Sequence, residues 1–257
     1  MLETTAYQLN YMPVIDLIWG KGFISPGGNG NVDKIVEGVD LQGKRVLELG
    51  SGGGAGALRL VVKYGAEVVG LDLEEPLVEL SRRRADEAGL IDKVEFQCVE
   101  PGPFAFEDES FDVFYTSGVI CHIEDRLSLF REVLRILKPG GMLLGYDWFP
   151  TVMSVDIIRW LKAARLNLFP DSPERYANIM GEAGFQNITH HDATRWYRNR
   201  CAEELEQLMG PLFDEAAELS SPEIRNSLIS EWHMANIVLR SGDLRTGYFR
   251  GRKLKVQ

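Results

Sequence analysis

The fold of this chain is decided by the stretch Val46-Leu47-Glu48-Leu49-Gly50-Ser51-Gly52-Gly53-Gly54. Residues 46–49 suit a buried strand, and the glycines let the backbone turn sharply and bring its amides close to a ligand. A helical stretch then begins near Ala55, and Asp72 closes the next apolar run. This spacing predicts that Asp72 lies at a strand tip, where its carboxylate can accept hydrogen bonds from both hydroxyls of a ribose. Such an arrangement is a nucleoside-cofactor site at the carboxyl edge of an open parallel sheet.

The middle of the chain alternates between short apolar runs and helical stretches, which is typical of a doubly wound parallel sheet. Strands are predicted at residues 45–50, 67–72, 93–98, 111–117 and 141–147. Helices are predicted at residues 55–65, 75–88 and 124–138, the last ending at Lys138-Pro139-Gly140-Gly141. A helix at 172–183, a sixth strand at 185–191 and an antiparallel seventh strand at 246–254 complete a Rossmann-like α/β sheet of seven strands.

Composition and charge exclude several kinds of protein. The 257 residues are 45% hydrophobic and 26% charged, which suits one elaborated globular domain over residues 1–257. The net charge of −10 argues against a nucleic-acid partner. No apolar stretch reaches the roughly 18 residues of a membrane span, and the N-terminus lacks the pattern of a secretion signal. Three widely spaced cysteines show neither a disulfide framework nor a zinc pattern, so we expect a cytoplasmic protein without a metal.

Three segments lie outside the alternating pattern of the core, which covers residues 45–147. Residues 1–44 precede the first strand and form a predicted N-terminal cap. Residues 148–171 and 195–243 carry apolar side chains at helical spacing and are predicted to be helical insertions. These apolar stripes are most simply packing faces. Their place after the fifth and sixth strands would nevertheless put them over the cofactor edge, where a lid or pocket wall belongs.

Two cofactor classes use a glycine loop followed by an acidic strand end. The run Gly50-x-Gly52-x-x-Ala55 also satisfies a loose dinucleotide fingerprint, so a nicotinamide or flavin enzyme is one alternative. Further along, the chain carries Phe111-Asp112-Val113-Phe114-Tyr115-Thr116-Ser117 and Leu137-Lys138-Pro139-Gly140-Gly141. With the Glu48-x-Gly50-x-Gly52-x-Gly54 loop, this ordered set resembles the class I (Rossmann-like) S-adenosylmethionine-dependent methyltransferases. The resemblance implies S-adenosyl-L-methionine (AdoMet) as the cofactor and methyl transfer as the reaction.

The resemblance also implies roles for residues around the cofactor. The backbone of the glycines should run alongside the methionine moiety, and Asp72 should bind the ribose. Glu100 stands where the family usually has an acid near the adenine amino group, although the following Pro101-Gly102-Pro103 departs from the usual loop, and a solvated surface acid is the alternative. The full set of implied cofactor residues is Ser25, Glu48, Gly50, Gly52, Gly54, Asp72, Leu73, Glu100, Pro101 and Ser117.

The segment before the first strand resembles that of one branch of these methyltransferases. The run Trp19-Gly20-Lys21-Gly22-Phe23-Ile24-Ser25-Pro26-Gly27-Gly28 is similar to the stretch that folds over AdoMet in phosphoethanolamine N-methyltransferases. On that match, Ser25 would meet the methionine carboxylate. The ending Arg245-Thr246-Gly247-Tyr248-Phe249-Arg250 also resembles the C-terminal strand of that family.

A catalytic pair of that family falls on two residues of this chain. Counting from the Ser25 and Tyr115 runs places its tyrosine at Tyr7 and its histidine at His122. Methyl transfer needs a neutral nucleophile with a free lone pair. A histidine that titrates near pH 6.5 can take the proton of an ammonium or hydroxyl, and a tyrosine hydroxyl can orient it. The resemblance therefore implies that His122 is the general base and Tyr7 its partner.

Several departures from that family concern its phosphate-binding residues. Ser117-Gly118 replaces Arg-Asp, of which the Asp faces the substrate amine. Trp148 replaces a phosphate-holding tyrosine, Leu166 and Leu168 replace an Arg-x-Tyr pair, and no cation stands at 235–237. A phosphate needs several donors or cations to offset its desolvation, so we expect a non-phosphorylated, less polar acceptor. The predicted substrate-pocket residues are Trp19, Phe23, Trp148, Leu166 and Leu168.

The sequence thus predicts AdoMet-dependent methylation of a small molecule, with an amine as the first choice of acceptor. O- or C-methylation of an apolar or aromatic metabolite is one alternative, since the pocket is apolar and the amine-facing Asp is missing. A non-catalytic AdoMet-binding protein is another, although the retention of Tyr7 and His122 argues against it. Nothing in the sequence sets the oligomeric state.

Overall fold

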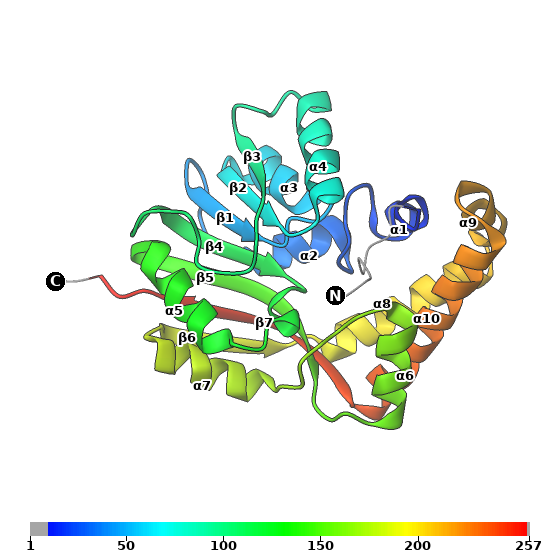
Figure 1. Ribbon diagram of the computed structural model, residues 1–257. Coiled ribbons are helices and arrows are strands. Elements are labelled where there is room, and N and C mark those ends of the chain that lie inside the picture. The colour runs from blue at the N-terminus through cyan, green and yellow to red at the C-terminus, as the bar shows by residue number, and fades with distance from the viewer. Residues whose placement is uncertain (1–9, 256–257) are drawn as a thin grey trace.

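Seven strands form one mixed sheet in the order β3-β2-β1-β4-β5-β7-β6, as Figure 1 shows for the computed structural model, which describes residues 10–255. Five strands are parallel: β1 (Arg45–Leu49), β2 (Glu67–Asp72), β3 (Val94–Cys98), β4 (Phe111–Ser117) and β5 (Leu137–Pro150). β7 (Leu244–Arg252) lies antiparallel between β5 and β6 (Gln186–Asp192). This confirms the predicted seven-stranded Rossmann-like sheet. The strand order reverses between β1 and β4, and ligands of such sheets bind at the carboxyl ends of the strands flanking that point.

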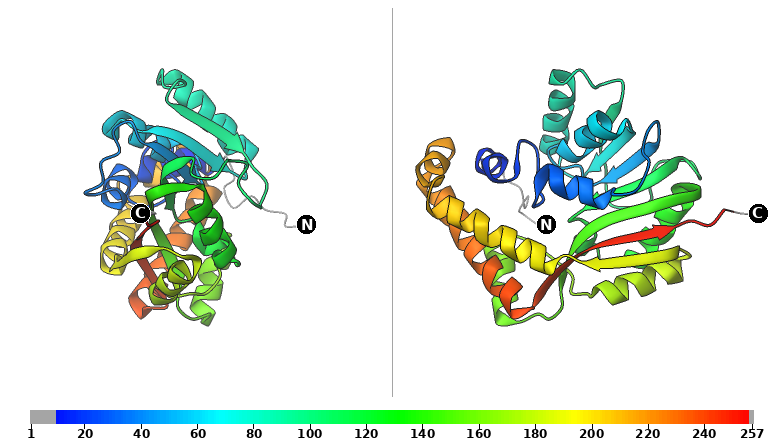
Figure 2. Two further views of the ribbon diagram at one scale, coloured as in Figure 1. Left: turned by 90° about the vertical axis from the view of Figure 1, so that its left-hand side faces the viewer. Right: turned by 180° about the vertical axis from the view of Figure 1, so that it is seen from behind.

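Helices cover both faces of the sheet (Figure 2). On one face, α2 (Gly28–Ile35), α3 (Ala55–Tyr64) and α4 (Glu75–Glu87) enclose an apolar core with side chains such as Val46 and Val68. On the other face, α5 (Arg126–Ile136) and α7 (Pro173–Ala183) pack on the intervening strand residues, among them Leu47 and Val69. Successive strand side chains point to opposite faces, so a strand covered on both sides is an unbroken apolar run. That is why these strands could be predicted from sequence.

Helix boundaries follow local capping chemistry. Asp125 caps α5 by accepting a hydrogen bond from the amide of Ser128 at 3.0 Å, and Ser172 caps α7 by accepting from the amide of Arg175 at 3.2 Å. α5 ends at Ile136, two residues before the predicted end, because β5 already pairs with β4 at Leu137. β5 also extends three residues beyond the prediction, to Pro150, since β7 provides a partner strand along its whole second half.

The two predicted insertions form a separate group of helices beyond the end of the sheet, which we call the helical lobe (Figures 1 and 2). It consists of α6 (Val155–Ala164), α8 (Thr194–Met209), α9 (Phe213–Leu219) and α10 (Pro222–Ser241). α10 packs along both α6 and α8 around a shared apolar core. The break between α8 and α9 falls at Gly210-Pro211. A short 3₁₀ helix, η1 (Ile120–His122), follows β4, and its Cys121 belongs to the apolar core of the lobe.

The predicted N-terminal cap touches both halves of the molecule. It includes α1 (Met12–Trp19) and the glycine-rich turn that leads into α2. Asp16 accepts a hydrogen bond from Arg84 Nη2 at 2.8 Å, and Arg84 Nη1 donates to the carbonyl of Gly53 at 2.8 Å. Trp19 meanwhile packs against Trp232 of α10, with ring centroids 5.3 Å apart. The cap therefore joins the glycine loop to the helical lobe.

Candidate functional site

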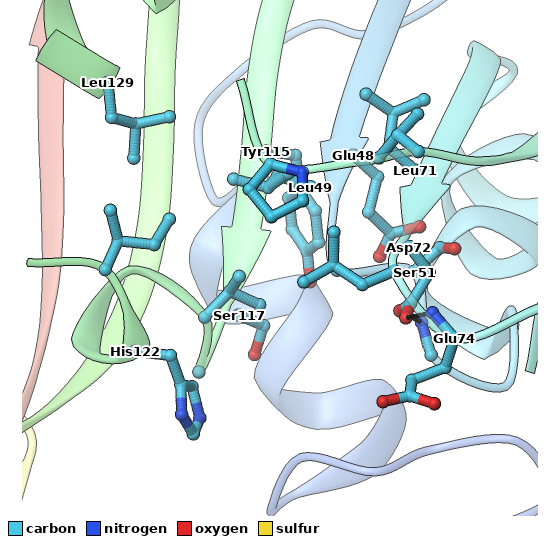
Figure 3. Close-up of a pocket in the computed structure, with 18 of the residues that line it drawn as sticks. Glu48, Leu49, Ser51, Leu71, Asp72, Glu74, Tyr115, Ser117, His122 and Leu129 are labelled. Carbon is cyan, nitrogen blue, oxygen red and sulfur yellow. Dashed lines mark hydrogen bonds between the residues drawn. The ribbon is translucent and has the colours of Figure 1, made fainter. Parts of the chain in front are cut away.

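A cavity of about 1340 Å³ lies at the carboxyl edge of the parallel strands. Its walls come from the ends of β1, β2, β3 and β4, from the cap, and from residues 167–169 before α7. Figure 3 shows residues of the wall, with Ser117 between His122 and Asp72 in that view. Pockets for one small ligand usually enclose about 300–1,000 Å³. This cavity therefore has room for a nucleoside cofactor and a small acceptor together.

The glycine loop forms the floor of the cavity beside β1. Gly50 has φ of 75° and Gly52 has φ of 52°, values that side-chain-bearing residues rarely adopt. A Cβ at Gly50 would collide with Val119, and one at Gly52 would collide with Ile24 of the cap. Both glycines line the cavity, and both are predicted to contact the cofactor. Gly54 does not: it caps α3, and a Cβ there would meet Ser81 of α4 and Phe96 of β3. Its position fits helix–helix packing rather than ligand contact.

Asp72 stands at the end of β2 and faces the cavity. Its Oδ2 accepts a hydrogen bond from the amide of Gly52 at 2.7 Å, and its Oδ1 accepts from the amide of Glu74 at 3.1 Å. Burial raises the pKa of this carboxyl, while the backbone amides lower it. A carboxylate has about four lone-pair positions, so each oxygen can accept one more hydrogen bond. The position and acceptors of Asp72 fit the two hydroxyls of a ribose.

Glu48 of β1 is the most unusual acid of the cavity. Its side chain is buried, and Oε2 has no hydrogen-bond partner within residues 10–255. Burial and, to a lesser extent, the nearby charge of Asp72 raise the pKa of Glu48 to about 8, although a hydrogen bond from the Ala57 amide acts in the opposite direction. An unpartnered buried acid oxygen is costly unless a ligand supplies a donor. Glu48 therefore fits a cofactor that carries an ammonium group, as AdoMet does.

The other predicted cofactor residues also line this cavity. Leu73 is 59% exposed, which is unusual for leucine and leaves an apolar surface against which a base can lie. Glu100 and Pro101 border the same side after β3. Ser25 Oγ and Ser117 Oγ lie 2.9 Å apart, and Asn31 Nδ2 donates to Ser117 Oγ at 3.3 Å.

His122 lies at the end of η1, where its ring reaches the cavity. Its Nδ1 is 2.9 Å from the carbonyl oxygen of Asn167. A carbonyl can only accept, so this contact requires the proton on Nδ1 and leaves the lone pair on Nε2. Burial lowers the pKa of His122, and the bond to the Asn167 carbonyl partly opposes that effect. The ring is therefore neutral at neutral pH and can accept a proton through Nε2.

The structure places some predicted residues elsewhere. Tyr7 lies outside the described residues, so its role stays a prediction. Trp19 packs on Trp232, and Leu166 and Leu168 pack against the core of the helical lobe. None of these three side chains lines the cavity within the described chain. Residues 166–169 follow the end of α6, and it is Asn167 and Phe169 that face the cavity, whereas Leu168 faces the apolar core.

Other cavity residues were missed by sequence reasoning. Asn31 accepts a hydrogen bond from the hydroxyl of Tyr248 at 3.0 Å and thereby links α2 to β7 beside Ser117. No sequence pattern in the glycine-rich run Gly28-Asn29-Gly30-Asn31 indicates that Asn31 lines the cavity. Ile24 and Val119 close over the glycine loop. Their fit against glycines is visible only after folding, while Phe23 and Trp148 line the cavity as predicted.

The charges around the cavity have one sign. Among residues 10–255, seven carboxylates and no lysine or arginine line it. The sequence of residues 1–9 contains neither lysine nor arginine either. The seven acids are Glu48, Asp72, Glu74, Glu100, Glu124, Asp125 and Glu132. Such a lining favours positively charged or neutral ligands over phosphates.

Two further features can be stated for the part of the chain that the structure describes. No group of three or more His, Cys, Asp or Glu side chains there is arranged to hold a metal ion. None of its helices is both long enough and apolar enough to cross a membrane.

The parallel sheet, the glycine loop and the acid at the tip of β2 define a nucleoside-cofactor enzyme fold. Residues 47–145 match the family model described as "Methyltransferase domain". Solved structures of the same fold include proteins in complex with AdoMet. Residues 47–145 therefore form a methyltransferase domain of the class I AdoMet-dependent type, whose cofactor is AdoMet.

The chain is similar in sequence and in fold to several phosphoethanolamine N-methyltransferases. It is 30% identical over 210 residues to phosphoethanolamine N-methyltransferase 1 of Arabidopsis thaliana, covering 80% of this chain and 42% of that protein. Phosphoethanolamine N-methyltransferase of Plasmodium falciparum is 27% identical over 98% of this chain and 95% of its own length. Phosphoethanolamine N-methyltransferase 2 of Haemonchus contortus, solved with AdoMet, superimposes with a TM-score of 0.90 at 25% identity, over 99% of this chain and 59% of that chain. The chain spans about half the length of the plant relatives it matches.

Proposed function

We propose that this protein transfers a methyl group from AdoMet to the amino group of a small, non-phosphorylated acceptor. The observation that carries this proposal is the lining of the cavity, which has seven acidic side chains and no lysine or arginine among the described residues. Both the sulfonium of the cofactor and an amine acceptor are cations before reaction. A phosphorylated acceptor would instead need cations or several donors to offset its desolvation.

The residues of the chain support this chemistry as follows. Bound AdoMet would supply a methyl group activated by a positively charged sulfur, and this sulfur is the leaving group when a lone pair bonds to the methyl carbon. An ammonium has no lone pair, so a base must first remove a proton. His122 Nε2 is an unprotonated nitrogen directed to the cavity, because Nδ1 is committed to the Asn167 carbonyl. Proton transfer to such a base contributes about 10²–10⁴-fold to a rate. Tyr7 remains the proposed partner of His122.

The acceptor end of the cavity carries aromatic surface. Phe23, Trp148 and Phe169 line the cavity, and the Phe169 amide donates to the carbonyl of Cys121, the residue before His122. The Trp148 ring stacks on Tyr197 of α8, with centroids 5.8 Å apart and planes 17° apart, and this contact fixes its orientation. Aromatic faces attract ammonium groups and also bury apolar carbon. This wall suits an amine with an apolar body.

The same aromatic wall favours a second candidate, which is O- or C-methylation of an apolar or aromatic metabolite. Such an acceptor also needs a neutral base when it carries a hydroxyl. The two candidates differ in the charge of the acceptor, and the acidic lining favours the amine. A non-catalytic role in AdoMet binding is less well supported, because His122 lines the cavity and its Nε2 has no hydrogen-bond partner among residues 10–255.

A methylation assay with labelled AdoMet tests the proposal. A panel of primary and secondary amines with apolar bodies should include acceptors, whereas phosphoethanolamine should be turned over far more slowly. His122→Ala should lower turnover roughly 10²–10⁴-fold with AdoMet affinity near wild type. His233→Ala, at an exposed histidine of α10, serves as the matched control. Efficient methylation of phosphoethanolamine would overturn the choice of acceptor, and full activity of His122→Ala would overturn the choice of base.

A further inference from the structure

Behind the cavity, four polar side chains form a buried network that no ligand can touch directly. Asp147 of β5 is 0% exposed, Tyr176 of α7 is 1% exposed, Arg126 of α5 is 6% exposed and Asp171 is 8% exposed. None of the four lines the cavity within the described chain. Replacing buried ionic groups by apolar side chains is often neutral or stabilising, so such a network is weak evidence for a role in stability. The hydrogen bonds of the network show which segments of the chain it holds in position.

One end of the network holds the turn that carries His122. Asp147 Oδ2 accepts a hydrogen bond from the amide of Cys121 at 2.9 Å, and Oδ1 accepts from the amide of Trp148 at 2.9 Å. Cys121 is the residue immediately before His122 in η1. Asp147 therefore fixes the backbone of His122 against β5.

The other end holds the segment that contacts the His122 ring. Arg126 Nη2 donates to the carbonyl of Phe169 at 3.0 Å, and Arg126 Nη1 donates to Asp171 Oδ2 at 3.0 Å. The amide of Phe169 in turn donates to the carbonyl of Cys121 at 2.9 Å. This segment contains Asn167, whose carbonyl oxygen lies 2.9 Å from His122 Nδ1. Arg126 therefore fixes the acceptor that determines which ring nitrogen carries the proton.

The hydroxyl of Tyr176 joins the two ends. It accepts a hydrogen bond from Arg126 Nε at 3.1 Å and donates to Asp147 Oδ2 at 3.2 Å. We propose that Tyr176 is a positioning residue, which holds the turn of His122 and the segment of Asn167 in register so that Nε2 of His122 points at the acceptor. This positioning role rests on the proposed function of His122 as the base.

That role needs only the hydroxyl of Tyr176, because the ring makes separate packing contacts that phenylalanine would keep. Its ring packs edge-on against Phe149 at 4.7 Å and against Phe130 at 6.1 Å between centroids. Tyr176→Phe keeps these contacts and removes only the hydroxyl that links Arg126 to Asp147. Tyr64→Phe is a matched control, because the Tyr64 hydroxyl also donates to a carboxylate, Asp33 Oδ1 at 2.8 Å, at the far end of α3 from the cavity.

The test combines nuclear magnetic resonance of the His122 ring with steady-state kinetics at pH 8. Burial raises the pKa of Asp147 to about 6, so this carboxyl is ionised at that pH. The other titratable or charged groups around it are the Cys121 thiol, Tyr176, Arg126 and Asp171. Wild-type and Tyr64→Phe proteins should show one His122 tautomer, with the proton on Nδ1. Tyr176→Phe should populate the Nε2–H tautomer and lose about 10- to 100-fold in kcat, with AdoMet affinity within about twofold of wild type.

The outcomes separate the positioning role from the catalytic role. An unchanged tautomer in Tyr176→Phe, or an equal loss of kcat in Tyr64→Phe, would overturn the positioning role. A changed tautomer with unchanged kcat would support the positioning of the ring and would refute His122 as the base. If Tyr176→Phe does not fold, Asp171→Asn weakens the Arg126 pair while keeping an amide oxygen. It should shift the tautomer in the same direction, and a failure to do so would overturn the positioning role.

Discussion

Replacing Glu48 by glutamine removes the ability of this side chain to ionise without changing the shape of the cavity floor. Burial raises the pKa of Glu48 from 4.5 to about 8, so between these pH values the unfolded chain releases a proton that the folded, cofactor-free protein retains. The stability of wild type should therefore fall as the pH rises through this window. At pH 7 the cost amounts to about 3 kcal/mol, and at pH 5 to under about 1 kcal/mol. The glutamine of the variant carries no charge at either pH.

Thermal and urea unfolding of the cofactor-free protein at pH 5, 6 and 7 would measure this difference. The free energy of unfolding of Glu48→Gln should rise relative to wild type by about 2–3 kcal/mol between pH 5 and pH 7. A buried amide without a partner adds a cost of its own, but that cost does not depend on pH, so the slope remains informative. Glu107→Gln, at an exposed glutamate outside the cavity, is the control and should show no slope.

Cofactor binding should reverse the behaviour of Glu48. S-adenosylhomocysteine carries an ammonium, which should favour the ionised carboxylate. Calorimetry at pH 7 in buffers of different ionisation enthalpy should then detect release of about one proton in wild type and none in Glu48→Gln. The variant should also bind more weakly by roughly 10- to 100-fold. Parallel stability curves for the two proteins from pH 5 to pH 7 would refute the buried-acid argument, and equal proton release would refute the ammonium contact.

Three further predictions concern the cavity and the cap. Asp72→Ala should weaken binding of S-adenosylhomocysteine roughly 10- to 100-fold, because two charge-assisted hydrogen bonds are lost; unchanged affinity by calorimetry would reject the ribose assignment. Since burial lowers the pKa of His122, kcat/KM should rise with pH through a limb below pH 6.5 that His122→Ala lacks, and a limb above 6.5 would contradict that shift. As the pH falls, His122 takes up a proton in the unfolded chain before it does so in the folded protein. The folded protein should therefore become less stable as the pH falls through 6.5. Residues 12–28 of the cap should exchange amide hydrogens faster without cofactor than with it, whereas equally slow exchange in both states would argue against a lid.

Much of the fold could be predicted because its signals are local. Apart from Glu48, residues 46–49 and 68–71 are apolar on both faces, and the glycines after β1 have backbone angles that few other residues adopt. The length of β5 could not be predicted in this way. Its last three residues are strand only because β7, nearly a hundred positions later, pairs with them.

The residues of the candidate site also divide into those that local sequence signals predict and those that depend on contacts between distant parts of the chain. Gly50, Gly52 and Asp72 line the cavity because they follow strands whose ends meet at one sheet edge. Leu166 and Leu168 were assigned by counting along the chain, but the backbone after α6 directs Asn167 and Phe169 to the cavity instead. The contact of the Asn167 carbonyl with His122 joins residues 45 positions apart, and no sequence pattern marks it.

The N-terminal cap contacts Gly53 through Arg84 at one side and Trp232 through Trp19 at the other. A segment that packs on both the glycine loop and the helical lobe cannot be ordered by one ligand without altering the binding surface offered to the second. Cofactor and acceptor should therefore bind with heterotropic cooperativity. By thermodynamic reciprocity, the acceptor must tighten AdoMet binding by the same factor by which AdoMet tightens acceptor binding. Loosening the cap at Asp16, a residue that does not itself line the cavity, should then reduce this coupling.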